Sequence, residues 1–395
     1  MSSSSLSSIS PISPVGYGAE SVFAYPPGPS ASSSASDDQS PGKKPLVMAY
    51  YPDWISSDFP PEKIAFDHYD WIDFAFAIPT ASCNLTWDDP QTAPALLSRL
   101  VDVGHAANTK IKLSIGGWTG SHYFSDAVAT NDSRQLFAEN IALVYKTFGI
   151  DGIDIDWEYP GHQGESANVV SHQDALNFLA FLRVLRAALP AGAIITAATQ
   201  PVPFVGEDGQ PMRDVSEFAT LLDWILIMNY DVYSSSSTPG PNAPFYDACH
   251  NSTQPEANAV GAFNAWNAAG VPASQMVLGI PSYGYLSTST ATTLRSRFIA
   301  RQTSSALVAD DNKPEGQIQF RSLVSQNALV LNSTSAVVSF VAGEGFVREW
   351  DECSSTPYLR SSQPGQVVSY DDTESLALKA AFVQKVGPWD SAFPF

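Results

Sequence analysis

Short apolar runs alternate with amphipathic segments along most of this chain, and this alternation constrains the fold more than any other feature. Seven β-branched or aromatic runs begin after Lys44: Val47–Tyr51, Trp71–Ala77, Ile111–Gly116, Gly152–Glu158, Ile194–Thr199, Trp224–Tyr230 and Met276–Tyr283. The segments between them with helical periodicity include Ala93–His105, Ser133–Phe148, Ser171–Leu189 and Ala257–Ala269. Strands that alternate with helices form parallel sheets. The sequence therefore predicts an α/β fold, a (β/α)8 or TIM barrel.

The regions outside the seven runs define the expected domain organisation. Residues 1–44 are rich in Ser and Pro without any period, which predicts a disordered leader before a single barrel domain over residues 45–395. A long segment after the seventh run, approximately residues 286–366, predicts a small α+β insertion with strands at Gln317–Leu323 and Ala336–Val341.

The C-terminal region does not complete the barrel pattern. Gln366–Tyr370 leads into an amphipathic helix predicted over Asp372–Val386. After Gly387 the chain has two prolines and no strand pattern, so the eighth strand is missing from the prediction. We therefore expect the first and seventh strands to expose unpaired edges, as in a truncated and poorly stable barrel.

The charge balance limits the partners that the chain can bind. It carries 40 acidic and 20 basic residues, a net charge of −20, which repels the phosphates of nucleic acids and anionic membrane surfaces. No run of eighteen apolar residues is present, so no membrane span is predicted. A neutral polysaccharide is not repelled, and nine Trp and fifteen Tyr can supply faces on which sugar rings stack.

Cysteines and sequons leave the compartment open. Cys83, Cys249 and Cys353 lie far apart without a CxxC pair, which argues against a zinc or dithiol site. One disulfide with a free thiol and three separate thiols are both compatible with these positions. Secretion is compatible with four sequons, at Asn84, Asn131, Asn251 and Asn332, but the N-terminus has no signal-peptide pattern. Extracellular, cell-wall and cytoplasmic locations all remain open.

The most informative stretch is residues 151–161, with the sequence DGIDIDWEYPG. Because side chains alternate along a strand, Asp154, Asp156 and Glu158 share one face, and the apolar residues between them share the other. In a barrel the acids would line the interior, with Glu158 nearest the C-terminal rim where catalysis occurs. Buried carboxylates about 6.5–7 Å apart repel each other, so stability alone does not explain them. Asp151 lies out of register and is predicted to be structural.

This stretch resembles the DxxDxDxE motif of family 18 glycoside hydrolases, the chitinase family. Further similarity to that family is carried by Leu113–Trp118 (LSIGGW), Met228–Asp231 (MNYD), Tyr50–Trp54 (YYPDW) and Ser369–Ser375 (SYDDTES). The resemblance extends from about residue 46 to residue 387, and the chain looks most like a fungal member. It implies hydrolysis of chitin or chito-oligosaccharides by a monomer that needs no cofactor and no metal.

The resemblance also implies a substrate-assisted, retaining mechanism. Glu158 would protonate the leaving oxygen while the sugar's own acetamido oxygen attacks the anomeric carbon, giving an oxazolinium ion. Asp156 would accept the acetamido N–H, and Asp154 would share a proton with Asp156. Tyr230 would orient the acetamido oxygen. The candidates for contacts with the sugar are Asp231, Met228, Trp118, Tyr51, Trp54, Gln200 and Tyr283.

Two other functions remain open on sequence grounds. An endo-β-N-acetylglucosaminidase that acts on N-glycans would use the same acid chemistry, because its substrate choice depends on rim loops. A weakly active or inactive chitin-binding, lectin-like protein is the second alternative. The retained Glu158 argues against it, whereas the missing eighth strand argues for it.

Overall fold

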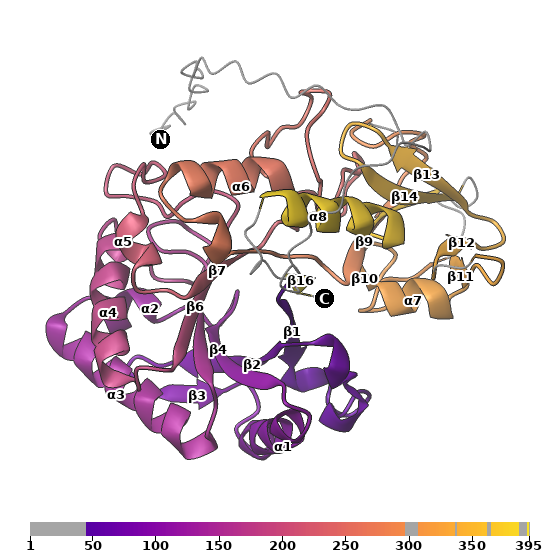
Figure 1. The fold of residues 1–395 in the computed structure, drawn as a ribbon. Coiled ribbons are helices and arrows are strands. Elements are labelled where there is room, and N and C mark those ends of the chain that lie inside the picture. Colours follow the sequence, from indigo (N-terminus) through magenta and orange to yellow (C-terminus); the bar gives the residue numbers. More distant parts are fainter. Residues whose placement is uncertain (1–44, 297–306, 336–337, 362–364, 387–392, 395) are drawn as a thin grey trace, which may run out of the picture. The chain divides into compact units, whose positions relative to one another are not determined.

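The computed structural model describes residues 45–296, 307–335, 338–361, 365–386 and 393–394 (Figure 1). The chain divides into two units, Met1–Gly42 and Lys43–Phe395. The first unit, for which we predict a disordered leader, lies outside the described residues. Within the described residues no helix is both long and apolar enough to cross a bilayer.

A curved sheet of parallel strands forms the centre of the second unit, which confirms the predicted fold class. Along the sheet the order is β16-β1-β2-β4-β5-β6-β7-β8, and the short β3 (Leu85–Trp87) pairs antiparallel with β2. The seven principal strands are β1 (Val47–Pro52), β2 (Trp71–Pro79), β4 (Lys110–Gly116), β5 (Gly152–Asp156), β6 (Ile194–Thr199), β7 (Trp224–Ile227) and β8 (Met276–Leu278). All seven coincide with predicted runs, but β5, β7 and β8 end earlier than expected.

Helices cover the outer face of this sheet, as Figure 1 shows for α1, α3 and α4. The helices between the strands are α1 (Ala93–Ala106), α2 (Phe124–Val128), α3 (Asn131–Phe148), α4 (Asp174–Ala188), α5 (Ser216–Ala219) and α6 (Ala259–Ala268). Four 3-10 turns lie at Asp53–Ile55, Pro61–Lys63, Phe66–His68 and Ala273–Gln275. The largest apolar core fills the space between the helices and the outward side chains of the strands.

Both ends of α3, the longest helix among the described residues, are set by capping residues. The Thr130 side chain accepts a hydrogen bond from the backbone N–H of Ser133, while the Ser133 hydroxyl accepts one from the Thr130 backbone, a capping box at the N-terminus. The helix ends at Gly149, whose φ of 63° is the left-handed conformation that glycine adopts without a Cβ penalty.

The insertion is a five-stranded antiparallel sheet in the order β10-β9-β15-β14-β13, with one helix and a separate β11–β12 hairpin. Its elements are β9 (Tyr283–Thr288), β10 (Gly316–Gln319), α7 (Phe320–Ser325), β11 (Leu329–Leu331), β12 (Phe340–Ala342), β13 (Val347–Asp351), β14 (Thr356–Ser361) and β15 (Gln366–Ser369). It therefore begins a few residues earlier than the predicted 286, because β9 follows β8 after only a short turn.

Two predicted strands of the insertion differ from the structure. Gln317–Leu323 is a strand only as far as Gln319, because the apolar residues that follow turn into α7 and bury Leu323. Of Ala336–Val341, only the last two residues belong to β12, and residues 336–337 lie outside the described part. Short apolar runs do not distinguish strand from helix by periodicity, which explains the first difference.

The C-terminal region also differs from its prediction. The helix α8 (Thr373–Val386) forms as expected. Beyond it, the sequence predicted no strand, yet Phe393–Pro394 form the two-residue strand β16, which pairs in parallel with β1 and lies beside β8. A strand of two residues that includes proline has no alternation to detect, so sequence reasoning could not find it.

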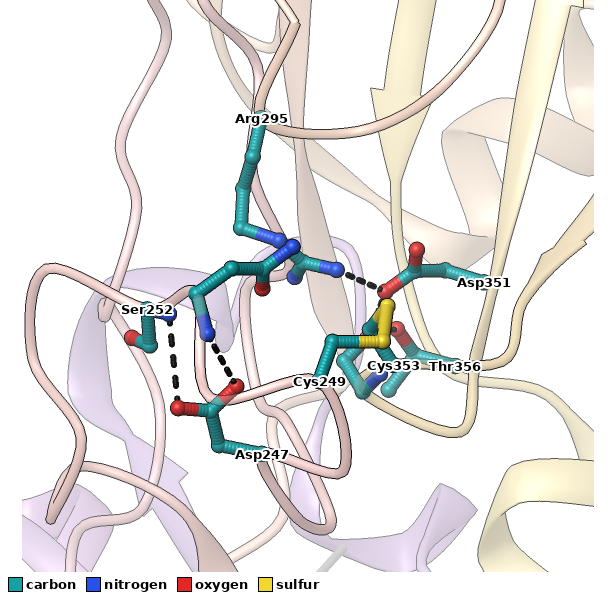
Figure 2. The surroundings of a disulfide bond; sticks show 9 residues. Asp247, Cys249, Ser252, Arg295, Asp351, Cys353 and Thr356 are labelled. Carbon is teal, nitrogen blue, oxygen red and sulfur yellow. Dashed lines mark hydrogen bonds and ion pairs between the residues drawn. A yellow bond between two sulfur atoms is a disulfide. The ribbon is translucent and has the colours of Figure 1, made fainter.

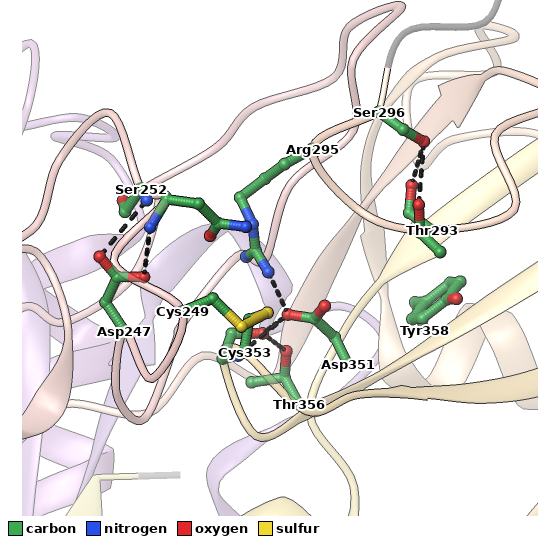
Figure 3. A network of polar contacts seen from close by, with 12 residues as sticks. Asp247, Cys249, Ser252, Thr293, Arg295, Ser296, Asp351, Cys353, Thr356 and Tyr358 are labelled. Carbon is green, nitrogen blue, oxygen red and sulfur yellow. Dashed lines mark hydrogen bonds and ion pairs between the residues drawn. A yellow bond between two sulfur atoms is a disulfide. The ribbon is translucent and has the colours of Figure 1, made fainter.

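A disulfide joins the barrel to the insertion. Cys249 in the loop between β7 and α6 is bonded to Cys353 in the turn between β13 and β14 (Figure 2). Cys83 is a buried free thiol. This settles the alternative that the sequence left open. Next to the disulfide, Arg295 forms an ion pair with Asp351 at 2.6 Å, and both side chains are about nine-tenths buried (Figure 3).

Candidate active site

The strand β5 carries the acids toward the inside of the barrel. Asp154 and Asp156 are buried there, while Ile153, Ile155 and Trp157 belong to the outer core. The Trp157 ring stacks on Phe124 at 5.1 Å between centroids, under helix α2. The alternation that we predicted from the sequence is therefore present, with acids inward and apolar residues outward.

Asp154 is saturated with hydroxyl donors. Its Oδ2 accepts hydrogen bonds from Tyr50 at 2.9 Å and Ser114 at 2.8 Å, and its Oδ1 accepts one from Thr196 at 2.6 Å. No hydrogen bond joins Asp154 to Asp156 in the part of the chain that the structure describes. The proton that we expect these two acids to share stays a prediction, and the oxygens of Asp154 accept hydrogen bonds from hydroxyls instead.

Asp156 has the opposite environment. Its Oδ1 is buried without a hydrogen-bond partner among the described residues. Burial raises the pKa of Asp156 well above its ordinary value, and the neighbouring charges of Glu158, Asp154 and Asp73 add to the effect. A buried carboxyl with an unfilled oxygen holds its proton and remains available to a ligand in the barrel mouth.

Glu158 lies two residues beyond the end of β5, at the C-terminal rim of the barrel. Its backbone N–H donates to Ser121 Oγ at 2.9 Å, and its carbonyl accepts from Asn168 at 3.1 Å. Burial raises the pKa of the Glu158 carboxyl to about 7, against a lowering hydrogen bond from Tyr159. A half-buried acid with a pKa near neutrality can both give and take a proton.

Two glycines let the strand ends approach closely at this point. Gly116 has a φ of 117°, and a Cβ there would lie 2.1 Å from the carbonyl oxygen of Asp156. Gly117 donates its N–H to that same oxygen at 2.8 Å. The LSIGGW motif therefore holds the end of β4 against the end of β5, just before Glu158.

Tyr230 and Asp231 follow β7 and face these acids. Burial raises the pKa of the Tyr230 hydroxyl well above its ordinary value, and the charges of Asp156 and Glu158 raise it further. Asp231 accepts hydrogen bonds from Tyr283, at 2.8 Å to each carboxylate oxygen, and from Tyr285 at 2.8 Å. The insertion strand β9 therefore supplies one wall of the site.

The predicted aromatic residues lie at the rim. Trp118 and Trp54 expose 51% and 62% of their surface, so both rings are free to receive a ligand. The Trp54 ring centroid lies 6.3 Å from that of Phe76 on β2, and Phe76 also lies against Gly117. Sequence reasoning missed Phe76, which contacts both Trp54 and the glycine that precedes Trp118.

Three other predicted contact residues have different positions. The prediction that Tyr51 contacts the sugar is wrong, because its ring belongs to the outer core and its hydroxyl donates to the Phe59 carbonyl. Met228 follows β7 and packs against the apolar cluster inside the barrel. Gln200 follows β6, and its carbonyl accepts a hydrogen bond from Trp266 at 3.0 Å. Among the described residues, no hydrogen bond joins the Gln200 side chain to the acids.

Several polar residues of the site were not predicted. The register of the strands places Tyr50 opposite Asp73, Asp73 opposite Lys112, Ser114 opposite Asp154 and Asp154 opposite Thr196. All these side chains point into the barrel from four strands next to β5 or near it. Once the strands are aligned, the alternation of side chains identifies these residues as neighbours of Asp154 on the inner face. The sequence alone does not give that alignment, because it does not contain the register of the strands.

Asp151 lies at the start of β5, away from the rim. Burial alone would raise the pKa of Asp151. Hydrogen bonds from Lys110, the backbone N–H of Ile111 and His105 instead hold this pKa below its ordinary value. These partners tie β5 to β4 and α1. Within the described ranges no group of three His, Cys, Asp or Glu side chains is arranged to hold a metal ion.

The barrel carries a row of inward carboxyls, and the row ends at the C-terminal rim in an acid that can exchange a proton. This is the arrangement of a glycoside-hydrolase-type protein. Comparisons with known proteins agree. The model of the family "Glycosyl hydrolases family 18" matches residues 46–387. This chain therefore belongs to family 18 of the glycosyl hydrolases.

Individual proteins with chitinase-like sequences and structures are also similar to this chain. A chitinase-like effector of Moniliophthora roreri is 36% identical over 87% of this chain and 86% of its own length. A chitinase-like effector of Moniliophthora perniciosa is 30% identical over 95% of this chain and 87% of its own. Among solved structures, a chitinase from Rhizomucor miehei superposes with a TM-score of 0.73 and 31% identity, covering 88% of this chain and 94% of that one.

Proposed function

We propose that this protein is a chitinase that hydrolyses β-1,4-linked N-acetylglucosamine chains with retention of configuration. The observation that carries the proposal is Glu158, a half-buried carboxyl at the barrel rim whose burial-raised pKa is about 7. An acid with that pKa is protonated often enough near neutral pH to donate to a leaving oxygen, and ionised often enough to act later as base.

The reaction needs a nucleophile that this set of acids does not provide. In the ordinary retaining mechanism a second carboxylate lies about 5–5.5 Å from the acid on the other side of the bond. Asp154 and Asp156 project from one face of β5, and Glu158 follows the same strand by two residues, so they cannot flank a sugar in this way. The substrate's own 2-acetamido oxygen therefore attacks the anomeric carbon as the bond to the leaving oxygen breaks.

Each neighbouring residue has a task in that step. Glu158 gives its proton to the leaving oxygen, and the sugar becomes an oxazolinium ion. The unpartnered Oδ1 of Asp156 accepts the acetamido N–H, and Tyr230 donates to the acetamido oxygen and orients it. Water then adds to the anomeric carbon, Glu158 takes a proton from it, and the acetamido group is restored. Exposed Trp118 and Trp54 stack against further sugar units.

Product stereochemistry tests this mechanism. Fluorogenic chitobioside and chitotrioside should be hydrolysed, with β-configured product seen first by proton NMR and with inhibition by a thiazoline analogue of the sugar. A substrate with hydroxyl in place of the acetamido group should react far more slowly. Product of α configuration, or equal rates on both substrates, would contradict the acetamido mechanism. Preferential release of glycans from a high-mannose glycoprotein would indicate an endo-β-N-acetylglucosaminidase instead.

A second candidate function is chitin binding without significant turnover. It is favoured by one observation, the description of the two Moniliophthora relatives as chitinase-like effectors, each covering most of this chain. The rim tryptophans serve either function. The two candidates are separated by measuring chito-oligosaccharide affinity and hydrolysis on the same preparation: tight binding with no product over hours would favour the binding function.

A further inference from the structure

One buried asparagine links the rim acid Glu158 to the exposed ring of Trp118. Asn168 lies in the loop between β5 and α4 and exposes 7% of its surface. Its Nδ2 donates hydrogen bonds to the backbone carbonyl of Trp118 at 3.0 Å and to that of Glu158 at 3.1 Å. A side-chain amide nitrogen has two protons, so each of the two carbonyls takes one of them. The backbones of the proposed proton donor and of an exposed aromatic residue therefore share one donor group.

Regular structure does not by itself hold either of these residues. Glu158 lies beyond the last residue of β5, so the ladder hydrogen bonds of the sheet end before it. Trp118 exposes 51% of its surface, so packing restrains only part of its side chain. Hydrogen bonds at the two backbones therefore determine where the carboxyl and the ring lie.

The backbone of Glu158 is held at both its N–H and its carbonyl. The N–H donates to Oγ of Ser121 at 2.9 Å, and Ser121 belongs to the same loop after β4 as Trp118. Asn168 holds the carbonyl. Gly164 allows the loop of Asn168 to come this close. A Cβ on Gly164 would lie 2.2 Å from the Glu158 carbonyl oxygen and 3.4 Å from the Trp118 ring.

Stability alone does not explain an asparagine at position 168. Its Oδ1 is buried without a hydrogen-bond partner among the described residues, and an unfilled buried acceptor destabilises the folded state. The side chain therefore serves through its two donors. The loop keeps it in place, because the Asn168 N–H donates to the Glu165 carbonyl at 3.1 Å and the Asn168 carbonyl accepts from Gln163 Nε2 at 3.3 Å.

We propose that Asn168 is a positioning residue that sets the Glu158 carboxyl and the Trp118 ring relative to each other, so that a sugar stacked on Trp118 presents its glycosidic oxygen to the acid. The inference rests on the proposed function. Proton transfer needs its partners at hydrogen-bond distance, and a displacement of about 1 Å can cost about 10²-fold in rate. Loss of the Asn168 amide should therefore impair two things together: the protonation of a sugar leaving group and the binding of a sugar at Trp118.

The protonation is tested by comparing two leaving groups in Asn168→Ala. The sugar that leaves from chitotetraose needs a proton from Glu158, whereas the dinitrophenolate that leaves from a dinitrophenyl chitobioside is stable as an anion. The variant should lower kcat/KM about ten- to hundredfold for chitotetraose and less than about threefold for the dinitrophenyl substrate. Equal losses on the two substrates would mean that Asn168 supports only the fold, and the inference would be wrong.

The position of the ring is tested without turnover, in a Glu158→Gln background. Calorimetry gives the affinity for chitopentaose in Asn168→Ala, in Trp118→Ala and in the combined variant. Asn168→Ala should weaken binding about three- to tenfold while Trp118 is present and should have no further effect once Trp118 is removed. Additive losses would show that Asn168 does not act through Trp118 and would overturn the inference.

Asn258→Ala is the matched control. Asn258 is also buried, with 3% of its surface exposed, and its side-chain amide bonds the Pro255 carbonyl and the Gly261 N–H, each at 2.8 Å, at the start of α6. This variant should lose thermal stability but keep the wild-type ratio of the two rates and the wild-type affinity. Asn168→Ser, which leaves room for water at the two carbonyls, replaces Asn168→Ala in both tests if the alanine variant does not fold.

The outcomes separate the inference from the proposed function. If the wild type binds chitopentaose but hydrolyses neither substrate, the proposed chitinase function fails and the affinity measurements alone decide the inference. If the wild type hydrolyses both substrates but the affinity losses are additive, the chitinase proposal stands and the inference about Asn168 is wrong.

Discussion

The hydroxyl of Tyr50 donates to Oδ2 of Asp154 at 2.9 Å and so joins β1 to β5 across the inside of the barrel. The next residue along the chain, Tyr51, faces the other way, and its hydroxyl donates to the Phe59 carbonyl at 2.8 Å. Of these two adjacent tyrosines, Tyr50 therefore contacts the acids inside the barrel, whereas Tyr51 lies in the outer core.

These two tyrosines give a matched pair of variants. Tyr50→Phe removes a hydrogen bond to a buried carboxylate, worth about 1.5–3 kcal/mol, so kcat should fall by about tenfold or more. Tyr51→Phe removes a neutral hydrogen bond and should lower the free energy of unfolding by about 1 kcal/mol without changing kcat. Chitobioside kinetics and thermal unfolding measure both effects. Equal kcat in the two variants would show that the Tyr50–Asp154 contact has no part in turnover.

Glu158→Gln tests the proton donor. The amide keeps the size of the side chain but cannot protonate a leaving group, and general acid catalysis contributes about 10²–10⁴ to the rate. Turnover should therefore fall by at least two orders of magnitude, while chito-oligosaccharide affinity, measured by calorimetry, stays close to wild type. Retention of a tenth of the wild-type turnover would mean that another group is the acid.

The inward row of acids could be predicted from the sequence because its two faces differ in polarity. Asp154 and Asp156 alternate with Ile153 and Ile155, and the structure has the acids inside and the isoleucines outside. On β1 both faces carry a tyrosine and apolar neighbours, so polarity does not identify the inner one. The sequence therefore predicts Tyr51 as a site residue in place of Tyr50, although the same rule of alternation applies to both.

The rest of the site depends on register, which local patterns do not contain. Lys112 alternates with apolar residues on β4, as Lys110 and Ser114 also do, and therefore has the same sequence signature as a surface lysine. Its burial follows only when β2 and β6 bring Asp73 and Thr196 within reach. Tyr285 likewise lies in the insertion, and only the path of β9 brings its hydroxyl to Asp231. Such contacts are products of the tertiary fold.

The disulfide between Cys249 and Cys353 is expected to stabilise the protein against thermal unfolding. It links residues separated by 104 positions, and a covalent link that closes so long a loop restricts the unfolded chain, a stabilisation of about 2–4 kcal/mol in typical cases. Cys249→Ser with Cys353→Ser should therefore unfold at lower temperature, and reductant should lower the wild-type midpoint to the same value. Cys83→Ala is the control, because it should respond to reductant as wild type does. An unchanged midpoint in the double variant would mean that the link contributes nothing to the folded state.

Stability should fall as the pH rises through the neutral range. The pKa of Glu158 is raised by burial from 4.5 to about 7, so between these values the folded protein binds more protons than the unfolded chain. The stabilisation is present below pH 4.5 and is lost as the pH rises toward 7. At 1.36 kcal/mol per unit, this one group costs about 2–3 kcal/mol at pH 8 relative to pH 4.5. Asp73, with a pKa raised to about 7 by burial, contributes in the same direction.

Glu158→Gln separates the contribution of this acid from the others, because glutamine does not titrate. The variant should match wild type in thermal midpoint near pH 4.5 and exceed it at pH 8, while wild-type kcat/KM falls above about pH 7 as the acid ionises. Glu165→Gln is the control: hydrogen bonds from Ala167 and Ser166 hold the pKa of that exposed carboxyl below its ordinary value, so its removal should not lessen the loss of stability at high pH. A Glu158→Gln midpoint that falls with pH as steeply as wild type would show that Glu158 titrates normally in the folded protein, and the assignment of a neutral acid at the rim would then be wrong.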